Sequence, residues 1–170
     1  MHPYYHPLFV EFLVYFNGNQ DYFEGHEVLE EYWKSIPGYN KSHPLTAYIL
    51  LSTGMYHWRR GNSQGASRTI DKAFLRLSTL DSKFELYKNE VDFQQLLKDI
   101  DHARNEIALG KSFHAIEIKL LSPYLLELVQ TKKEQLLLLT FGSDDVIHKH
   151  MLRDRSDILK LRNEKKKSGR

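Results

Sequence analysis

The stretch Asp21-Tyr-Phe-Glu-Gly-His26-Glu27-Val-Leu-Glu30-Glu31-Tyr-Trp33 places one histidine and several carboxylates on a short segment that is also rich in large aromatic residues. Asp21 and Glu24 have the spacing of an N-terminal capping box. This spacing predicts that a helix begins at about Asp21, and the apolar pattern that follows extends it to about Lys34.

The polar residues of this helix divide between two faces. At about 100° of rotation per residue, Tyr22, Leu29 and Trp33 form one apolar stripe. His26 and Glu30 fall beside that stripe, not on the solvent face. Polar groups that face a protein interior need partners, so they form either a satisfied structural network or a binding site.

Length and composition predict one soluble domain with a substantial core. The chain has 170 residues, of which 41% are hydrophobic and 27% charged. These shares are typical of globular proteins. No cysteine is present, which excludes disulfides and thiolate metal ligands. The start lacks the pattern of a secretory signal, and the longest apolar run is far too short to span a membrane. We therefore expect a cytoplasmic protein.

The charge is unevenly distributed along the chain. Between Arg153 and Arg170, eight basic residues oppose three acidic ones, whereas residues 1–152 carry 16 basic and 19 acidic residues. The main body is therefore mildly acidic, which argues against a nucleic-acid-binding surface on the fold. The sequence leaves open whether the partner is a small molecule, another protein or a second copy of the chain.

The hydrophobic periodicity predicts an all-α, single-domain bundle of about six to seven helices. Residues 1–142 are expected to form the helical core domain, and residues 143–170 a C-terminal amphipathic helix with a basic, frayed tail. Capping-box spacing at Asp92 and Gln95 and the Ser122-Pro123 pair mark two further helix starts. The segment 112–121 alternates in a way that also suits extended chain. The helices are expected over residues 7–16, 21–34, 45–60, 62–80, 92–110, 122–141 and 144–167.

The third predicted helix, over about residues 45–60, supplies a second histidine. The helix face of His57 carries mostly small residues, so another helix can approach closely there. Helices joined by a short connection tend to pack as neighbours. We therefore expect His26, Glu30 and His57 to converge, with Glu27 at the edge of the group.

Three interpretations of this group remain open at the level of sequence. It is a buried hydrogen-bond network, a divalent metal site with His26, Glu30 and His57 as ligands, or a metal-free pocket with acid–base groups. The zinc-protease motif H-E-x-x-H is not met, because Glu30 stands where its second histidine would be.

The segment Arg59-Arg60-Gly61-Asn62 ends the third helix, and its composition suits helix termination. A second interpretation places Arg60 and Asn62 at the mouth of the His57 gap, where they would bind an anionic group.

Two blocks, Tyr15–Trp33 and Tyr56–Ala66, resemble a widespread family of small all-helical prokaryotic proteins catalogued only as a domain of unknown function. The shared pattern reads F-N-x-G-x-[YF]-[FW]-E-x-H-E-x-L-E-x-x-W followed by Y-H-x-x-R-G-N-x-x-G-A. Some members are labelled metal-dependent hydrolases. Relatives often have glutamine where Leu50 stands, which puts any ligand role of that position in doubt here.

The resemblance implies an all-α fold in which the two blocks pack together, and it adds Asn17 to the candidate residues. We take Glu27, Glu30 and His57 as candidate catalytic residues, and Asn17, Arg60 and Asn62 as candidate ligand-binding residues. The expected function is a polar pocket that binds a divalent metal or a small anionic ligand. The alternative is a non-catalytic protein-interaction module whose histidine and glutamate residues only hold the fold.

Overall fold

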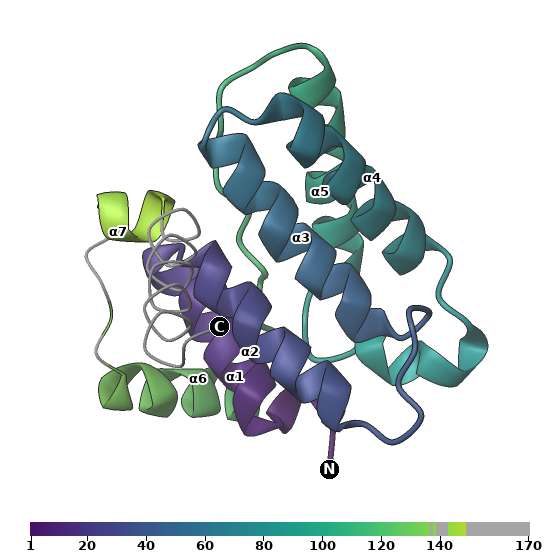
Figure 1. Cartoon of the computed structure of the whole chain (residues 1–170). Helices are drawn as coiled ribbons and strands as arrows, with labels where there is room; N and C mark the ends of the chain where they lie inside the picture. Colours follow the sequence, from purple (N-terminus) through teal and green to yellow (C-terminus); the bar gives the residue numbers. More distant parts are fainter. Residues whose placement is uncertain (137, 139–142, 149–170) are drawn as a thin grey trace, which may run out of the picture.

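The computed structural model describes residues 1–136, 138 and 143–148, and the described residues are predominantly helical (Figure 1). They contain seven α-helices and no strand, which confirms the predicted all-α class. The α-helices are α1 Pro7–Leu13, α2 Tyr22–Ser35, α3 Pro44–Arg59, α4 Ser63–Ser78, α5 Phe93–Ala108, α6 Pro123–Gln135 and α7 Asp144–Ile147.

Each long helix packs against its neighbour in one continuous series. α6 lies against α1, α1 against α2, α2 against α3, α3 against α4, and α4 against α5. Figure 1 shows α2 and α3 running side by side in opposite directions, with α4 and α5 on one side of them and α1 and α6 on the other. α3 is therefore the central helix, as its nearly all-round apolar sequence predicts.

Side-chain caps start four of the helices at the positions that their sequences indicate. Asp21, Asn62, Asp92 and Ser122 each accept a hydrogen bond from the backbone N–H three residues later. These bonds satisfy amide groups that a helix N-terminus otherwise leaves without an acceptor. The predicted starts at Asp21, Asp92 and Ser122 are thus confirmed.

Three His-Pro pairs cap further helical segments, a signal that the sequence reading passed over. His2 caps a 3-10 turn, Pro3–Tyr5, while His6 caps α1 and His43 caps α3. In each case the imidazole Nδ1 accepts from the backbone N–H two residues later, at 3.1 Å. Proline suits the first helical position because its missing N–H would have no partner there.

Several segments differ from the predicted helices. α6 ends at Gln135, where we expected a helix to about residue 141. α1 ends at Leu13 and continues as a π-helical stretch, Val14–Asn19, where we expected a helix to Phe16 and then a turn. Gln20 closes it with a left-handed backbone (φ 55°). A 3-10 helix at Ser82–Lys88 was not predicted. Where we expected a helix over residues 144–167, α7 covers only Asp144–Ile147 and ends with His148 as its C-cap; residues 149–170 lie outside the described part of the chain.

The segment between α5 and α6 is extended, one of the two conformations that its alternating pattern allows. Ile116 and Ile118 are buried, whereas Glu117 and Lys119 are exposed. An isolated antiparallel bridge pairs Val91 with Leu120. This segment returns the chain from the end of α5 to the side of α1.

The core is unusually rich in aromatic side chains. Tyr4, Phe9 and Tyr48 are fully buried, and Tyr4 stacks on Phe9 with ring centroids 4.3 Å apart. The Tyr4 hydroxyl lies 2.7 Å from the Tyr48 hydroxyl and also donates to the Tyr87 carbonyl. Burial holds the pKa of the Tyr4 hydroxyl well above its usual value. Each buried hydroxyl in this group thus has a hydrogen-bond partner, as a stable core requires.

The small residues of α3 contact two neighbouring helices, whereas we expected this face to meet α2. A methyl group on Gly54 would lie 2.5 Å from Ile70 Cδ1, so Gly54 faces α4. On the other side, a methyl group on Gly25 of α2 would lie 3.0 Å from Ser52 Oγ of α3. The close approach of α2 to α3 therefore depends on a glycine in α2.

Acid should destabilise the fold through the histidine caps. A neutral Nδ1 accepts the Leu45 N–H, and the protonated ring cannot. Burial, with a contribution from Lys83, lowers the pKa of His43 below its ordinary 6.5. The unfolded chain then binds more protons than the folded chain as pH falls below about 6.5, so stability is lost toward acid.

We expect His43→Asn, which keeps a cap acceptor, to reduce the pH dependence of the melting temperature between pH 7 and 5. We expect His43→Ala to cost about 1 kcal/mol at neutral pH. An unchanged slope in His43→Asn would contradict this role.

Gly54→Ala should destabilise the protein by about 1–3 kcal/mol, because the new methyl group overpacks against Ile70. Urea unfolding measures this cost. In an Ile70→Ala background, which lacks both clashing atoms, Cδ1 and Cγ1, the same substitution should cost less. Equal costs in the two backgrounds would show that α3 and α4 do not meet as described.

Candidate functional site

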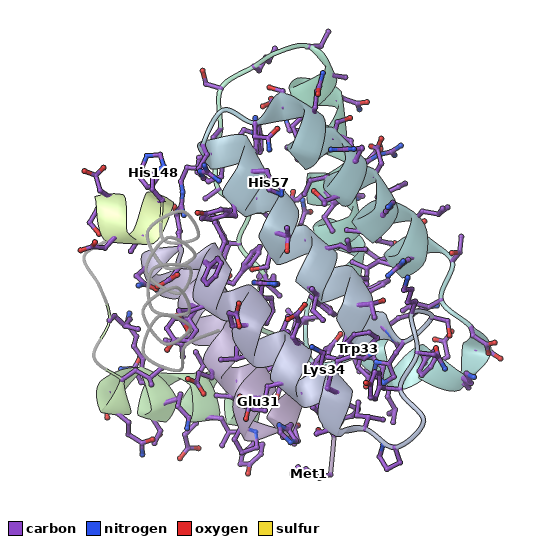
Figure 2. All side chains as sticks on the ribbon, viewed as in Figure 1. Met1, Glu31, Trp33, Lys34, His57 and His148 are labelled. Carbon is purple, nitrogen blue, oxygen red and sulfur yellow. The ribbon has the colours of Figure 1, made fainter. Side chains whose placement is uncertain are left out.

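A pocket of about 310 Å³ opens between α2 and α3. Figure 2 shows His57 near the C-terminal end of α3. Trp33 and Lys34 lie far from it, at the C-terminal end of α2. The pocket combines aromatic surface with a few polar groups, as small-molecule sites commonly do. We call it the α2–α3 pocket. Its lining residues are Tyr22, Phe23, His26, Glu27, Thr53, Tyr56 and His57.

His26 and His57 line the same pocket, together with Glu27. Glu30 is not among the lining residues, although its carboxylate is near His26. The helix period explains the difference: His26 and Glu27 lie about one turn after the N-terminus of α2, where α3 ends, and Glu30 lies a turn further on.

His26 is oriented by its own helix. Its Nδ1 lies 3.2 Å from the Phe23 carbonyl, which can only accept, so Nδ1 carries a proton. Nε2 is then the acceptor of the neutral ring. Nε2 lies 3.6 Å from a Glu30 oxygen, and Nδ1 lies 3.8 Å from a Glu27 oxygen. Both separations exceed hydrogen-bond length. The side chain is 22% exposed, so His26 is accessible from the pocket.

His57 is oriented by the cap of the next helix. Asn62 Oδ1 accepts from the Gly65 N–H at 3.0 Å, which fixes the amide so that Nδ2 faces the His57 ring. Nδ2 lies 3.3 Å from His57 Nδ1 and can only donate. The neutral His57 ring therefore carries its proton on Nε2. His26 and His57 thus present opposite hydrogen-bonding character at Nε2.

Tyr22 adds a buried polar atom to the pocket wall. Its hydroxyl is fully buried and has no hydrogen-bond partner among the described residues. Burial raises the pKa of this hydroxyl, while the nearby Arg59 opposes the rise. The Arg59 guanidinium lies 4.7 Å from the Tyr22 ring centroid and donates to the Gln20 carbonyl at 2.7 Å. A buried hydroxyl without a partner is costly and marks a place where a ligand or water can bind.

The remaining candidate ligand-binding residues lie around the pocket in different roles. The Arg60 guanidinium packs 5.1 Å from the centroid of the lining residue Tyr56. Asn62 caps α4 and contacts His57. Asn17 lies elsewhere: its amide donates to the Ile118 carbonyl at 2.8 Å and accepts from the Ile118 N–H at 2.9 Å. Asn17 therefore fastens the extended segment to the π-helical stretch.

Metal-ligating residues come together at another place. Among the described residues, the group of three whose donor atoms all lie within 4.8 Å of one another is His102, Glu106 and His114. The sequence reading missed it. The sequence shows the i, i+4 spacing of His102 and Glu106 on α5. His114 reaches them only because the extended segment brings it there, which no local pattern shows. The set of His26, Glu30 and His57 stays a prediction.

The fold and the pocket together define a class: an all-α protein with a histidine-containing pocket between two antiparallel helices. Residues 9–69 match the family described as "Domain of unknown function (DUF309)". The matched segment contains both blocks on which the resemblance rests, as well as every lining residue of the α2–α3 pocket.

One relative matches the chain over most of its length. The "Uncharacterized protein YpuF" of Bacillus subtilis (strain 168) is 29% identical over 162 residues, which cover 91% of this chain and 90% of that protein. No solved structure matches the chain significantly. Within the described residues, no helix is long and apolar enough to cross a membrane.

Asn17→Ala should lower the free energy of unfolding by about 2–3 kcal/mol, because it removes both hydrogen bonds to the Ile118 backbone. Asn17→Asp keeps the acceptor and loses the donor, so we expect it to lower the free energy of unfolding as well. Urea unfolding measures both. If Asn17→Ala were as stable as the parent protein, the fastening role would be wrong and a ligand-binding role would gain support.

Proposed function

We propose that this protein binds a small polar ligand in the α2–α3 pocket, held between the imidazoles of His26 and His57. The observation that supports this most is the opposite character of the two rings. Neutral His26 offers an acceptor at Nε2, because the Phe23 carbonyl holds the proton on Nδ1. Neutral His57 offers a donor at Nε2, because Asn62 donates to its Nδ1. A ligand with a donor and an acceptor side by side complements such a pair.

The lining also limits the size and shape of the ligand. Tyr22, Phe23 and Tyr56 supply aromatic surface, and the cavity of about 310 Å³ is at the lower end of small-molecule sites. Both features favour a compact, planar ligand. The Glu27 carboxylate at the pocket favours a neutral ligand or one that donates to it. An anionic ligand would depend on Arg60, whose guanidinium packs on Tyr56.

The catalytic form of the proposal is hydrolysis, the label that some relatives carry. Glu27 or Glu30 would serve as base, and His57 would donate to developing negative charge. A metal held by His26, Glu30 and His57 would supply Lewis-acid chemistry when bound. His26 and Glu30 provide two adjacent donors, yet His57 does not join them in a group of three within 4.8 Å among the described residues. The geometry therefore favours the metal-free pocket, and we assign no step to a metal here.

The alternative of a purely structural network has less support. Such a network is expected to have hydrogen bonds of normal length throughout. His26 lies 3.6 and 3.8 Å from its two carboxylates, which are themselves about 36% and 43% exposed. We therefore prefer ligand binding to a role in holding the fold or in protein interaction. We also propose a cytoplasmic location and leave self-association open.

The test uses ligand-observed NMR with three planar probes: 2-pyridone, 2-aminopyridine and benzoate. The first two carry a donor and an acceptor side by side, and benzoate carries only negative charge. We expect 2-pyridone or 2-aminopyridine to bind the parent protein. His26→Gln and His57→Gln should each weaken that binding by about tenfold, the value of one hydrogen bond of about 1.4 kcal/mol.

The matched control is His102→Gln, which changes a histidine outside the pocket and should leave binding unchanged. Thr53→Leu fills the pocket and should abolish binding without lowering the melting temperature. Binding of benzoate alone would favour the anionic ligand. Absence of binding by all three probes, or binding that survives Thr53→Leu, would contradict the proposed pocket.

A further inference from the structure

A second group of ionisable side chains lies outside the α2–α3 pocket. His102 and Glu106 stand one turn apart on α5, and His114 lies on the extended segment that follows α5. His102 Nε2 is 2.8 Å from Oε1 of Glu106, and His114 Nε2 is 2.8 Å from Oε2 of the same carboxylate. We call these three residues the α5 cluster. Its two imidazoles thus converge on one carboxylate from different elements.

The local backbone holds His114 in place. α5 ends at Ala108, and Gly110 turns the chain back with φ 72°. The Lys111 N–H donates to the Glu106 carbonyl at 2.9 Å, and the Trp58 indole donates to the Lys111 carbonyl at 3.1 Å. The His114 ring packs edge-on against Trp58 with centroids 5.0 Å apart. The Gly110 turn, two hydrogen bonds and one ring contact therefore hold this end of the cluster in place before any ligand binds.

The three side chains of the α5 cluster differ in their exposure to solvent. Glu106 is only 15% exposed, whereas His102 is 65% and His114 43% exposed. The carboxylate is thus partly withdrawn from water while both imidazole Nε2 atoms are directed at it. His114 Nδ1 lies 3.4 Å from the Ala115 carbonyl. Protein ligands to metals commonly have this arrangement, with the second ring nitrogen directed at a backbone carbonyl.

We propose that the α5 cluster is a divalent metal site, with His102 Nε2, His114 Nε2 and the Glu106 carboxylate as ligands. Two imidazoles and one carboxylate suit zinc and similar first-row ions, and three protein ligands leave a position for water or a substrate atom. With metal–ligand distances of about 2.0–2.2 Å, tetrahedral ligands lie about 3.3 Å apart. The present separations of 2.8 Å need to open by about 0.5 Å, which the exposed side chain of His102 permits.

This site differs from the set of His26, Glu30 and His57 that the sequence suggests. It shares no residue with the α2–α3 pocket, and it lies outside the segment 9–69 that matches the family. The competing account is a hydrogen-bonded clasp in which Glu106 only fastens the extended segment to α5. The clasp and the metal site predict opposite results when metal is added.

The experiment titrates untagged full-length protein with Zn²⁺ by calorimetry, and with Cu²⁺ by tryptophan fluorescence. The chain has two tryptophans, so Trp33→Phe leaves Trp58 as the reporter. We expect one Zn²⁺ per chain, a rise in melting temperature, and quenching of Trp58 by Cu²⁺ because its ring contacts His114. His102→Ala, Glu106→Gln and His114→Ala should each weaken Zn²⁺ binding by about 100-fold or more, since even outer-shell changes cost 10–100-fold.

His26→Ala is the matched control and should bind Zn²⁺ as the parent protein does. The exposed position of His102 makes His102→Ala the variant that best retains the fold, which its melting temperature without metal verifies. Loss of Zn²⁺ binding in His26→Ala but not in His102→Ala would overturn the proposal and favour the α2–α3 pocket as the metal site. Absence of stoichiometric Zn²⁺ binding in the parent protein would overturn it in favour of the clasp.

Discussion

The close contact between α2 and α3 is the constraint on which the rest of the structure depends. Gly25 leaves room for the Ser52 side chain, whose hydroxyl donates to the Tyr22 carbonyl at 2.8 Å. A methyl group at Gly25 would also lie 3.3 Å from the Phe12 ring of α1. One glycine therefore sits where three helices meet. Because this contact brings α2 close to α3 near the start of α2, the end of α3 can supply His57 to the same pocket as His26.

Consecutive residues at the end of α3 serve separate parts of the molecule. His57 lines the α2–α3 pocket, and Trp58 contacts Phe113 and His114 of the extended segment. Adjacent helix residues point about 100° apart, so one turn of α3 reaches both sides. Arg59 continues the pattern by packing against Tyr22 and donating to Gln20. The central helix thus determines the positions of the pocket and of the segment that completes the α5 cluster.

Much of the fold was predictable because its signals are local. The caps at Asp21, Asp92 and Ser122 and the helical periodicity required only residues within one or two turns. The His-Pro caps were equally local, and they were missed because histidine is seldom considered as a capping residue. The π-helical stretch after α1 and the 3-10 helix at Ser82–Lys88 depend on tertiary packing, which no short-range pattern encodes.

The candidate site was predictable only where helix periodicity determines it. Periodicity placed His26 beside the apolar stripe, and chain connectivity placed His57 near it. Neither could show that Glu30 stands outside the pocket lining, or that Asn17 bonds to Ile118 across 101 residues of sequence. The α5 cluster was likewise predictable only in part. His102 and Glu106 form a helical pair, whereas His114 approaches them only because Gly110 reverses the chain.

The central claim is that His26 and His57 present opposite hydrogen-bonding nitrogens to one pocket. Long-range nitrogen–proton correlation NMR on histidine-labelled protein reads this directly. The measurement is made at a pH of about 8.5, well above the ordinary imidazole pKa of about 6.5. We predict that His26 carries its proton on Nδ1 and His57 on Nε2. The same tautomer in both rings, or the reverse assignment, would contradict the account.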